Sequence, residues 1–319
     1  MIVDLPDTTT SAVSKSLVKI REENGVVALG RVLTLVIATP LGEEEEAIGA
    51  ANDASREHPM RVIVLSKDPA PPKDEAPRLD AEIRVGGDAG ASEVIVLRAY
   101  GAAASDEEGL VTSLLLPDAP VVVWWPTNHP ESPRDSALGK IATRRITDAA
   151  ASDDPLATLE ALGAHYSPGD TDFAWTRLTL WRAQLAAVLD QPPYEPVTGI
   201  EVSGSSDSPS TELLAAWLQQ ELQVPVELDI TDPVDGISGI HGVTLTRSAG
   251  AIVLERLVPN VATLSQPEQP NHDISLPRRS LRDCLAEELR RLDPDDLYGE
   301  VIQNGLGALG TPAKKRSRG

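Results

Sequence analysis

The 319-residue chain has little of what would place it directly in a class of proteins. Its single cysteine, Cys284, excludes an intrachain disulfide, a CxxC redox pair and a thiolate metal cluster. No apolar run approaches the roughly 20 residues that a membrane-spanning helix needs. Aromatic residues make up only 3% of the sequence, so the cores must consist mainly of Leu, Val, Ile and Ala. Each of the five tryptophans is therefore a feature to follow.

Positive charge is also scarce. Lys and Arg number 28 against 49 Asp and Glu, which gives a formal net charge of -21. Such a polyanion repels phosphate backbones and anionic lipids, which argues against binding to nucleic acid or to a membrane surface. The one basic cluster, KKRSR at 314–318, is interpreted as part of a flexible basic tail at 306–319, with a contact arm as the alternative. The N-terminal residues include an early acid and no basic segment before a long apolar run, so we expect no signal peptide and a cytoplasmic protein.

The sequence also lacks the common catalytic signatures. It contains no HExxH or GxSxG motif, and its glycine-rich loop at 86–90 neither reads GxGxxG nor is followed by GK[ST]. The five histidines are scattered and show no metal-ligand spacing: His58, His129, His165, His241 and His272. We therefore expect no catalytic residues, no metal site and no cofactor. The four glutamates at 43–46 are typical of the first turn of a helix, where acids complement the helix dipole, and a cation site is the alternative.

The first 150 residues alternate between apolar runs of strand length and helical segments. Strands are expected at 32–38, 61–65, 80–85, 93–99, 121–125 and 145–148, and helices at 11–23, 43–58, 106–116 and 136–143. Continuous apolar runs are typical of strands in a parallel sheet that is covered on both faces. This pattern predicts an N-terminal α/β domain at residues 1–150.

The rest of the chain predicts a helical connector at 151–192 and a second α/β domain at 193–305. Apolar side chains in the connector recur at spacings of three and four and share one face: Trp175, Leu178, Trp181, Leu185, Val188 and Leu189. Strands of the second domain are expected at 197–202, 224–230, 243–247, 251–257 and 261–265, and closing helices at 278–292 and 294–303. The predicted fold class is α/β, with two layered α/β units that have largely parallel or mixed sheets and are joined by a helical segment.

The most apolar stretch, LLLPDAPVVVWWP at 114–126, ends in Trp124, Trp125 and Pro126. Neighbouring residues of a strand point to opposite faces of the sheet. Our hypothesis is that one indole packs inward and the other lies near a face that meets a partner, because tryptophan is enriched at interface hot spots. The alternative is that a sheet covered on both faces buries both indoles.

A glycine-rich loop follows the strand expected at 80–85. Gly86, Gly87 and Gly90 could cradle an anion with backbone N–H groups. The next run resembles a strand rather than the helix that a phosphate loop needs, which favours a flexible turn.

A second loop, at 203–211, links a strand to a helix N-terminus, where a phosphate group is favoured. It offers hydroxyl groups at Ser205, Ser206 and Ser208, and Pro209 fits the first helical position. Asp207 opposes a phosphate there and the segment has no basic residue, so a capped loop is the alternative.

Six stretches spread over most of the chain carry a family resemblance. They are MIVDLPDTTT at 1–10, ANDASREHPMRVIVL from 51, RVGGDAGASEVIVLRAYG from 84, LLLPDAPVVVWWP from 114, RRITDAA from 144 and SLRDCLAEELRRLDPDDLYGE from 280. These blocks resemble the glucose-6-phosphate dehydrogenase assembly protein family, OpcA, in its actinobacterial form.

The resemblance implies a non-catalytic factor that assembles or activates glucose-6-phosphate dehydrogenase, the NADP-dependent entry enzyme of the oxidative pentose phosphate pathway. That enzyme is the implied partner, and no catalytic residues are carried over. The family is linked to thioredoxin-dependent control in photosynthetic bacteria, but an internal disulfide switch cannot operate with Cys284 alone. The alternative is a sugar-phosphate-binding protein or lactone hydrolase that uses 203–211 as its phosphate site, and weak metabolite binding fits either function.

Overall fold

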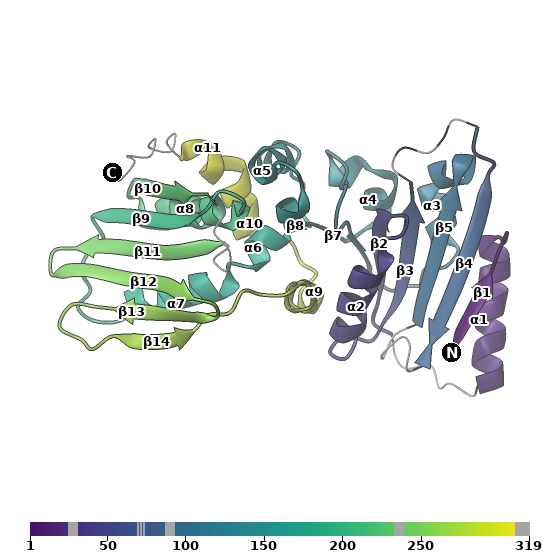
Figure 1. Cartoon of the computed structure of the whole chain (residues 1–319), viewed down its shortest axis with the longest axis horizontal. Coiled ribbons are helices and arrows are strands. Elements are labelled where there is room, and N and C mark those ends of the chain that lie inside the picture. The colour runs from purple at the N-terminus through teal and green to yellow at the C-terminus, as the bar shows by residue number, and fades with distance from the viewer. Residues whose placement is uncertain are drawn as a thin grey trace. The chain divides into compact units, whose positions relative to one another are not determined.

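A computed structural model of the chain describes residues 1–24, 31–68, 70, 72, 74–86, 93–232 and 239–309 (Figure 1). Gly87, Gly90 and the basic cluster at 314–318 lie outside these residues, so the predictions made for them stay predictions. Within the described chain, no helix is long and apolar enough to cross a membrane.

The chain divides into two compact units. The first comprises Met1–Asp148, Gly169–Thr171 and Ser280–Pro294, and the second comprises Ala149–Pro168, Asp172–Arg279 and Asp295–Gly319. These bounds differ from the expected domains at 1–150, 151–192 and 193–305. Most of the expected connector belongs to the second unit, because its apolar stripe packs into the core of that unit.

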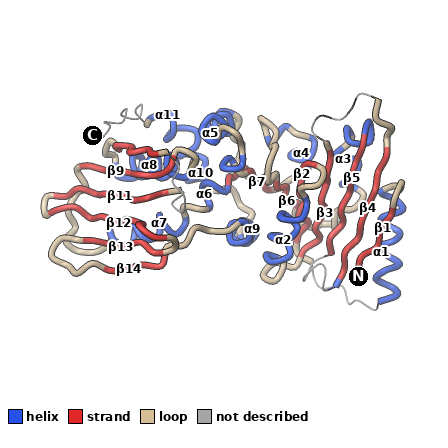
Figure 2. Tube along the Cα trace, in the orientation of Figure 1, coloured by secondary structure: helices blue, strands red, loops and turns tan. Residues whose placement is uncertain are grey.

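The first unit is built on an eight-stranded sheet with the strand order β1-β4-β5-β3-β2-β6-β7-β8, and Figure 2 shows the strands β1 to β7. The strands are β1 (Ile2–Leu5), β2 (Leu33–Pro40), β3 (Met60–Lys67), β4 (Arg78–Val85), β5 (Glu93–Tyr100), β6 (Val121–Trp124), β7 (Arg144–Thr147) and β8 (Asp170–Asp172). The five strands from β5 to β7 in this order are parallel, whereas β4 is antiparallel to both of its neighbours. The sheet is therefore mixed and largely parallel, as the apolar runs predict.

Helices cover both faces of this sheet. One face packs against α1 (Thr10–Asn24), the 3₁₀ helix η2 (Gly101–Ser105), α3 (Glu107–Thr112) and α4 (Ala137–Ile141). On the other face lie α2 (Glu44–Ala54) and α9 (Leu281–Arg290), which pack against each other. Crossovers between parallel strands are right-handed. The connection from β2 to β3 and the connection from β5 to β6 run in opposite directions across the sheet. The helices in these two connections, α2 and α3, therefore lie on opposite faces. The central strands are buried on both sides, which explains why their sequences are continuously apolar.

Charged side chains are also buried in the first unit, and they are paired. Glu93, at the start of β5, accepts hydrogen bonds from Arg21 at 2.7 Å and from Arg61 at 2.9 Å. Burial raises the pKa of Glu93, but the bond from Arg21 and the charge of Arg61 outweigh it and hold the pKa below its ordinary value. Arg145 and Asp170 form a second buried pair between β7 and β8.

The second unit has a six-stranded mixed sheet with the order β10-β9-β11-β12-β13-β14. The strands are β9 (Gly199–Ser205), β10 (Val226–Thr231), β11 (Ile240–Arg247), β12 (Gly250–Val258), β13 (Val261–Ser265) and β14 (His272–Ser275). Strand β10 is parallel to β9, and all other neighbours are antiparallel. The β11–β12 hairpin forms at the turn expected at 248–250, where Gly250 adopts a φ of 128°.

The helices of the second unit supply most of its core together with the sheet. They are α5 (Pro155–Ala164), α6 (Phe173–Thr176), α7 (Thr179–Leu189), α8 (Pro209–Leu222), α10 (Asp296–Glu300), the π-helical turn η5 (Val301–Gly305) and α11 (Leu306–Ala308). The predicted apolar stripe is split between α6 and α7, and Trp175, Trp181 and Leu185 are buried in the core. Helix α8 buries Leu213, Leu214 and the apolar residues that follow them in the same core.

Candidate functional site

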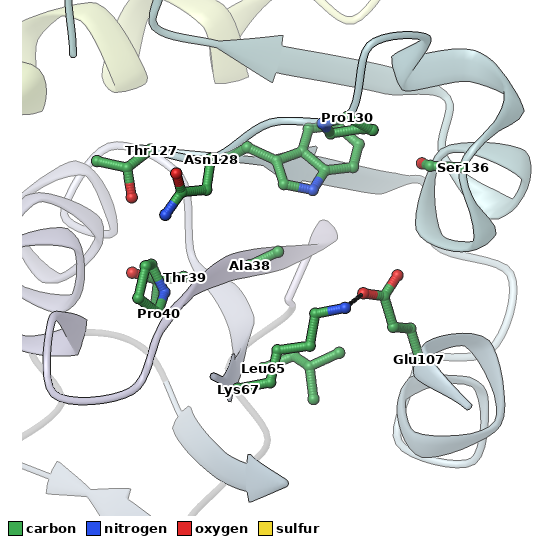
Figure 3. Close-up of a pocket in the computed structure, with 11 residues that line it drawn as sticks. Ala38, Thr39, Pro40, Leu65, Lys67, Glu107, Thr127, Asn128, Pro130 and Ser136 are labelled. Atoms are coloured by element: carbon green, nitrogen blue, oxygen red, sulfur yellow. Dashed lines mark ion pairs between the residues drawn. The ribbon is translucent and has the colours of Figure 1, made fainter. Parts of the chain in front are cut away.

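A crevice lies at the carboxyl ends of the central strands of the first unit (Figure 3). Its cavity has a volume of about 170 Å³. Strands contribute Ala38, Thr39, Pro40, Leu65 and Lys67, and the segments that follow contribute Glu107, Trp125, Thr127, Asn128, Pro130 and Ser136. Strand β2 pairs with β3 on one side and with β6 on the other, so the crevice occupies the switch point of the strand order. Open α/β sheets bind their ligands at this position.

The sequence after β6 shapes one wall of the crevice. The Trp125 backbone N–H donates to the Ile146 carbonyl oxygen at 3.0 Å, which keeps the chain beside β7 for one more residue. Asn128 then adopts a left-handed conformation with a φ of 49°, and the chain turns across the mouth. Ser136 caps α4 by accepting a hydrogen bond from the Gly139 N–H at 3.0 Å. The loop is therefore anchored at both of its ends.

The charges inside the crevice neutralise each other. Lys67, at the end of β3, extends toward Glu107 in the first turn of α3, and the two side chains form an ion pair (Figure 3). The rest of the described lining consists of uncharged residues, and Leu65, Trp125 and Pro130 give it apolar surface. This lining fits an apolar or neutral group better than an anion, because an anion would have to compete with Glu107 for Lys67.

The first turn of α2 makes the neighbouring hollow acidic. This hollow shares Thr39 and Thr127 with the crevice and is lined by Glu43, Glu45 and Glu46. The hydrogen bond from Arg84 lowers the pKa of Glu45, so this carboxylate stays charged at neutral pH. In dinucleotide-binding sheets the pyrophosphate lies at the N-terminus of the helix that follows the first strand. Here that helix begins with carboxylates and the turn before it lacks the glycine fingerprint, so the residues do not fit a dinucleotide.

Both tryptophans of the predicted interface are buried. Trp124 is 0% exposed and Trp125 is 5% exposed, because the strand is covered on both faces. The structure therefore agrees with the alternative interpretation, in which a sheet covered on both faces buries both indoles. Trp125 nevertheless lines the crevice, and the half-buried Pro126 lines the acidic hollow beside it.

The residues of the two predicted anion loops are not brought together. Gly86 follows β4 with a φ of 73°, in the first unit. Ser205 is buried at the end of β9, and Ser206 is exposed. Ser208 occupies the N-cap position of α8, as predicted, but within the described chain its side chain makes no capping hydrogen bond. It lines a separate hollow in the second unit.

The sequence reasoning missed Lys67, Glu107 and Ser136, which complete the crevice. Lys67 and Trp125 follow the apolar runs of two parallel strands, and the carboxyl ends of such strands meet at one edge of the sheet. Applied to the sequence, that rule would have predicted that Lys67 and Trp125 lie close together. Glu107 and Ser136 begin short helices, and only the packing of α3 and α4 on the sheet brings them to the same edge.

Two protein-family models match the chain. One describes the N-terminal domain of a glucose-6-phosphate dehydrogenase subunit and matches residues 51–164, and the other describes the C-terminal domain and matches residues 168–302. No curated protein sequence matches the chain.

Solved structures of low sequence identity are similar to this chain. An oxidoreductase from Sinorhizobium meliloti superposes with a TM-score of 0.50 at 11% identity, over 87% of this chain and 96% of that chain. A myo-inositol dehydrogenase from Lactobacillus casei, solved in complex with NAD(H) and myo-inositol, gives a TM-score of 0.42 at 9% identity, over 87% and 93% of the two chains. The first of these shows that the two-unit α/β fold occurs elsewhere, and the likeness extends to the fold alone.

Proposed function

The chain belongs to the glucose-6-phosphate dehydrogenase assembly protein family, OpcA, and we propose that it is a non-catalytic partner that binds this dehydrogenase and favours its active oligomer. The match of both domain models, one to each half of the chain, carries the proposal. Such a partner raises activity by shifting the population of enzyme states toward the one that it binds best.

The crevice of the first unit supports a binding role over a catalytic one. It lies where related sheets bind ligands, yet its one described basic side chain, Lys67, is paired with Glu107. The hollow next to it is lined by glutamates where a dinucleotide would need to place its pyrophosphate. Among the residues that the structure describes, no group of three or more His, Cys, Asp and Glu side chains could hold a metal ion.

We assign the contact with the dehydrogenase to the crevice and to the loop at 126–130. The largely apolar walls and the buried indole of Trp125 would receive an apolar side chain of the partner, and Asn128 on the exposed loop would contact its surface. In this role Trp125 is the floor of a pocket rather than a protruding anchor. Interfaces concentrate their binding energy in such desolvated pockets.

Substituting Ala38 by Leu tests this assignment. Ala38 is partly buried at the end of β2 and lines the crevice, so a leucine there fills space that the partner would occupy. We expect binding of the dehydrogenase to weaken by roughly 30-fold, which corresponds to losing one hot-spot contact of about 2 kcal/mol. Ala187→Leu, at an exposed position of α7, adds the same bulk away from the crevice. Equal affinities of both variants and the wild type would remove the crevice from the interface.

A further inference from the structure

One edge of the six-stranded sheet in the second unit is open. Strand β10 is the outermost strand at that edge, and β9 is the one described strand that pairs with it. A strand in this position presents a row of unpaired backbone N–H and C=O groups, which is a template for pairing with another chain. The β10 edge, formed by Val226–Thr231, is therefore a candidate site for the addition of a further strand.

The hydrogen bonds around β10 show which of its backbone groups face outward. The Thr231 carbonyl oxygen accepts a hydrogen bond at 2.9 Å from the backbone just after β9, and so faces that strand. The Val226 N–H points away from β9 and donates to the Gln219 side-chain oxygen at 3.3 Å. Residues of a strand turn their backbone groups alternately to its two edges, so those of Leu228 and Ile230 also face the free side.

The side chains of β10 form two rows of different character. Val226, Leu228 and Ile230 are half-buried on the helix side of the sheet, where the first two pack against the core of the unit. Glu227 and Asp229 alternate with this apolar row, are exposed, and lie on the opposite face of the sheet. An added strand would continue both rows, because directly opposed side chains on paired strands contact each other.

A groove adjoins the start of β10 and extends the free edge. Its cavity has a volume of about 770 Å³ and lies within the second unit. The end of α8, the segment that leads into β10 and the helical segment at 300–308 supply its described lining. Val224 and Pro225 give the groove apolar surface, and Glu300 is the one charged residue in that lining. The groove therefore offers space for a segment that runs on beyond β10, and its charge has the same sign as that of the strand.

We propose that the β10 edge binds an extended segment of a partner protein in which basic and apolar side chains alternate. The added strand pairs with the outward backbone groups of β10. Its basic side chains lie beside Glu227 and Asp229, and its apolar side chains cover the half-buried apolar row. Main-chain hydrogen bonds supply the affinity in this mode of recognition, and alternate side chains supply the specificity. The site goes beyond the contact assigned to the crevice and does not depend on it.

The pattern of β10 disfavours two other occupants. A second copy of the chain would bring its own Glu227 and Asp229 to the edge, and like charges on paired strands repel each other. Charged side chains on an edge strand protect it against such self-pairing. The basic cluster of this chain, KKRSR at 314–318, lacks the alternating apolar residues that would cover the apolar row. A basic and apolar segment of another protein therefore fits β10 better than either.

Fluorescence anisotropy of labelled peptides, titrated with the full-length protein at low ionic strength, tests the proposal. The probes are peptides with blocked ends: KVKVKV, its rearrangement KKKVVV and the acidic EVEVEV. KVKVKV is expected to bind roughly 10-fold more tightly than either of the others, because it alone places lysines beside both carboxylates and valines beside the apolar row. Equal binding of KVKVKV and KKKVVV would show attraction by charge alone and overturn strand addition. Absence of KVKVKV binding at millimolar concentration would overturn it as well.

Charge reversal on β10 locates the site. The double variant Glu227→Lys, Asp229→Lys is expected to bind KVKVKV roughly 10-fold more weakly than the wild type and to bind EVEVEV more tightly, because each cross-strand charge pair changes sign. Both positions are exposed, so the variant is expected to fold. The control variant Glu160→Lys, Asp190→Lys changes the net charge equally, at exposed positions on α5 and after α7. If the two double variants bind KVKVKV equally well, the peptide does not bind at β10.

The Ile230→Pro variant tests the backbone contact. The Ile230 N–H faces the free side, so proline removes a donor that β9 does not use. We expect this variant to bind KVKVKV more weakly than the wild type, and unchanged binding would contradict strand addition. If the proline variant does not fold, the exchange of peptide preference in the charge-reversal variant decides the proposal.

Discussion

Glu212 provides a quantitative test of the structure of the second unit. It lies in the first turn of α8 and is 8% exposed. Its Oε2 atom has no hydrogen-bond partner within the described chain. Burial raises the pKa of Glu212 from an ordinary value of 4.5 to about 7. The folded protein therefore retains a proton on this carboxyl group over a pH range in which the unfolded chain has released it.

The sign and the size of the effect follow from this shift. Because the folded-state pKa is the higher one, the contribution to stability is complete below about pH 4.5 and is lost as the pH rises through about 7. Each pKa unit corresponds to about 1.4 kcal/mol, so the free energy of unfolding falls by up to about 3 kcal/mol between these limits. Glutamine has the same shape and cannot ionise. The Glu212→Gln variant is therefore expected to equal the wild type at pH 4.5 and to exceed it by up to about 3 kcal/mol at pH 8.

Urea unfolding measured by tryptophan fluorescence at several pH values between 4.5 and 8 checks this expectation. The quantity to compare is the difference in unfolding free energy between variant and wild type, because contributions from the first unit cancel in that difference. Glu221→Gln is the matched control, since Glu221 lies on the same helix and is exposed. If the Glu212→Gln difference is as flat across pH as that of the control, the carboxyl group is not buried as described.

Three further substitutions test the core of the first unit. Trp125→Ala should lower the free energy of unfolding by about 3–5 kcal/mol, and a melting curve equal to that of the wild type would contradict its buried position. Asp170→Asn removes the carboxylate charge that pairs with the buried Arg145, so chemical denaturation should show a loss of about 3–5 kcal/mol. Glu93→Gln should destabilise by about 3 kcal/mol at pH 7 and less in acid, because a carboxylate with a lowered pKa contributes stability above its ordinary pKa and loses it as pH falls. A Glu93→Gln defect that is independent of pH would show that the arginines around Glu93 do not act through its charge.

The sequence predicts six of the eight strands of the first unit, because burial of the central strands on both faces leaves continuous apolar runs, and it misses the edge strands β1 and β8. Boundaries of helices are less predictable. The helix expected at 106–116 ends at Thr112, since the chain turns there and Leu114 packs into the core under the sheet. The helix expected from 278 begins instead at Leu281, where Ser280 and Asp283 form a capping box. That box is visible as a Ser-x-x-Asp pattern and could have corrected the start.

Other features leave no usable local signal. Strand β14 is polar and mostly exposed at the edge of its sheet, so its residues lack any apolar periodicity. The burial of both tryptophans could not be predicted, because the sequence of one strand cannot show whether the second face of its sheet is covered. The arginines that line the same hollow as Ser208 are separated by up to about a hundred residues in the chain, and only the folded second unit brings them together: Arg177, Arg256, Arg278 and Arg279.

We propose that this chain binds glucose-6-phosphate dehydrogenase and acts without chemistry of its own. The most direct measurement mixes it with the dehydrogenase of the same organism. Mass is followed by size-exclusion light scattering, and NADPH production is recorded across substrate concentrations. We expect a co-eluting complex with a higher rate or a lower half-saturation concentration, and no NADPH from this chain alone. Separate peaks with unchanged kinetics would contradict it.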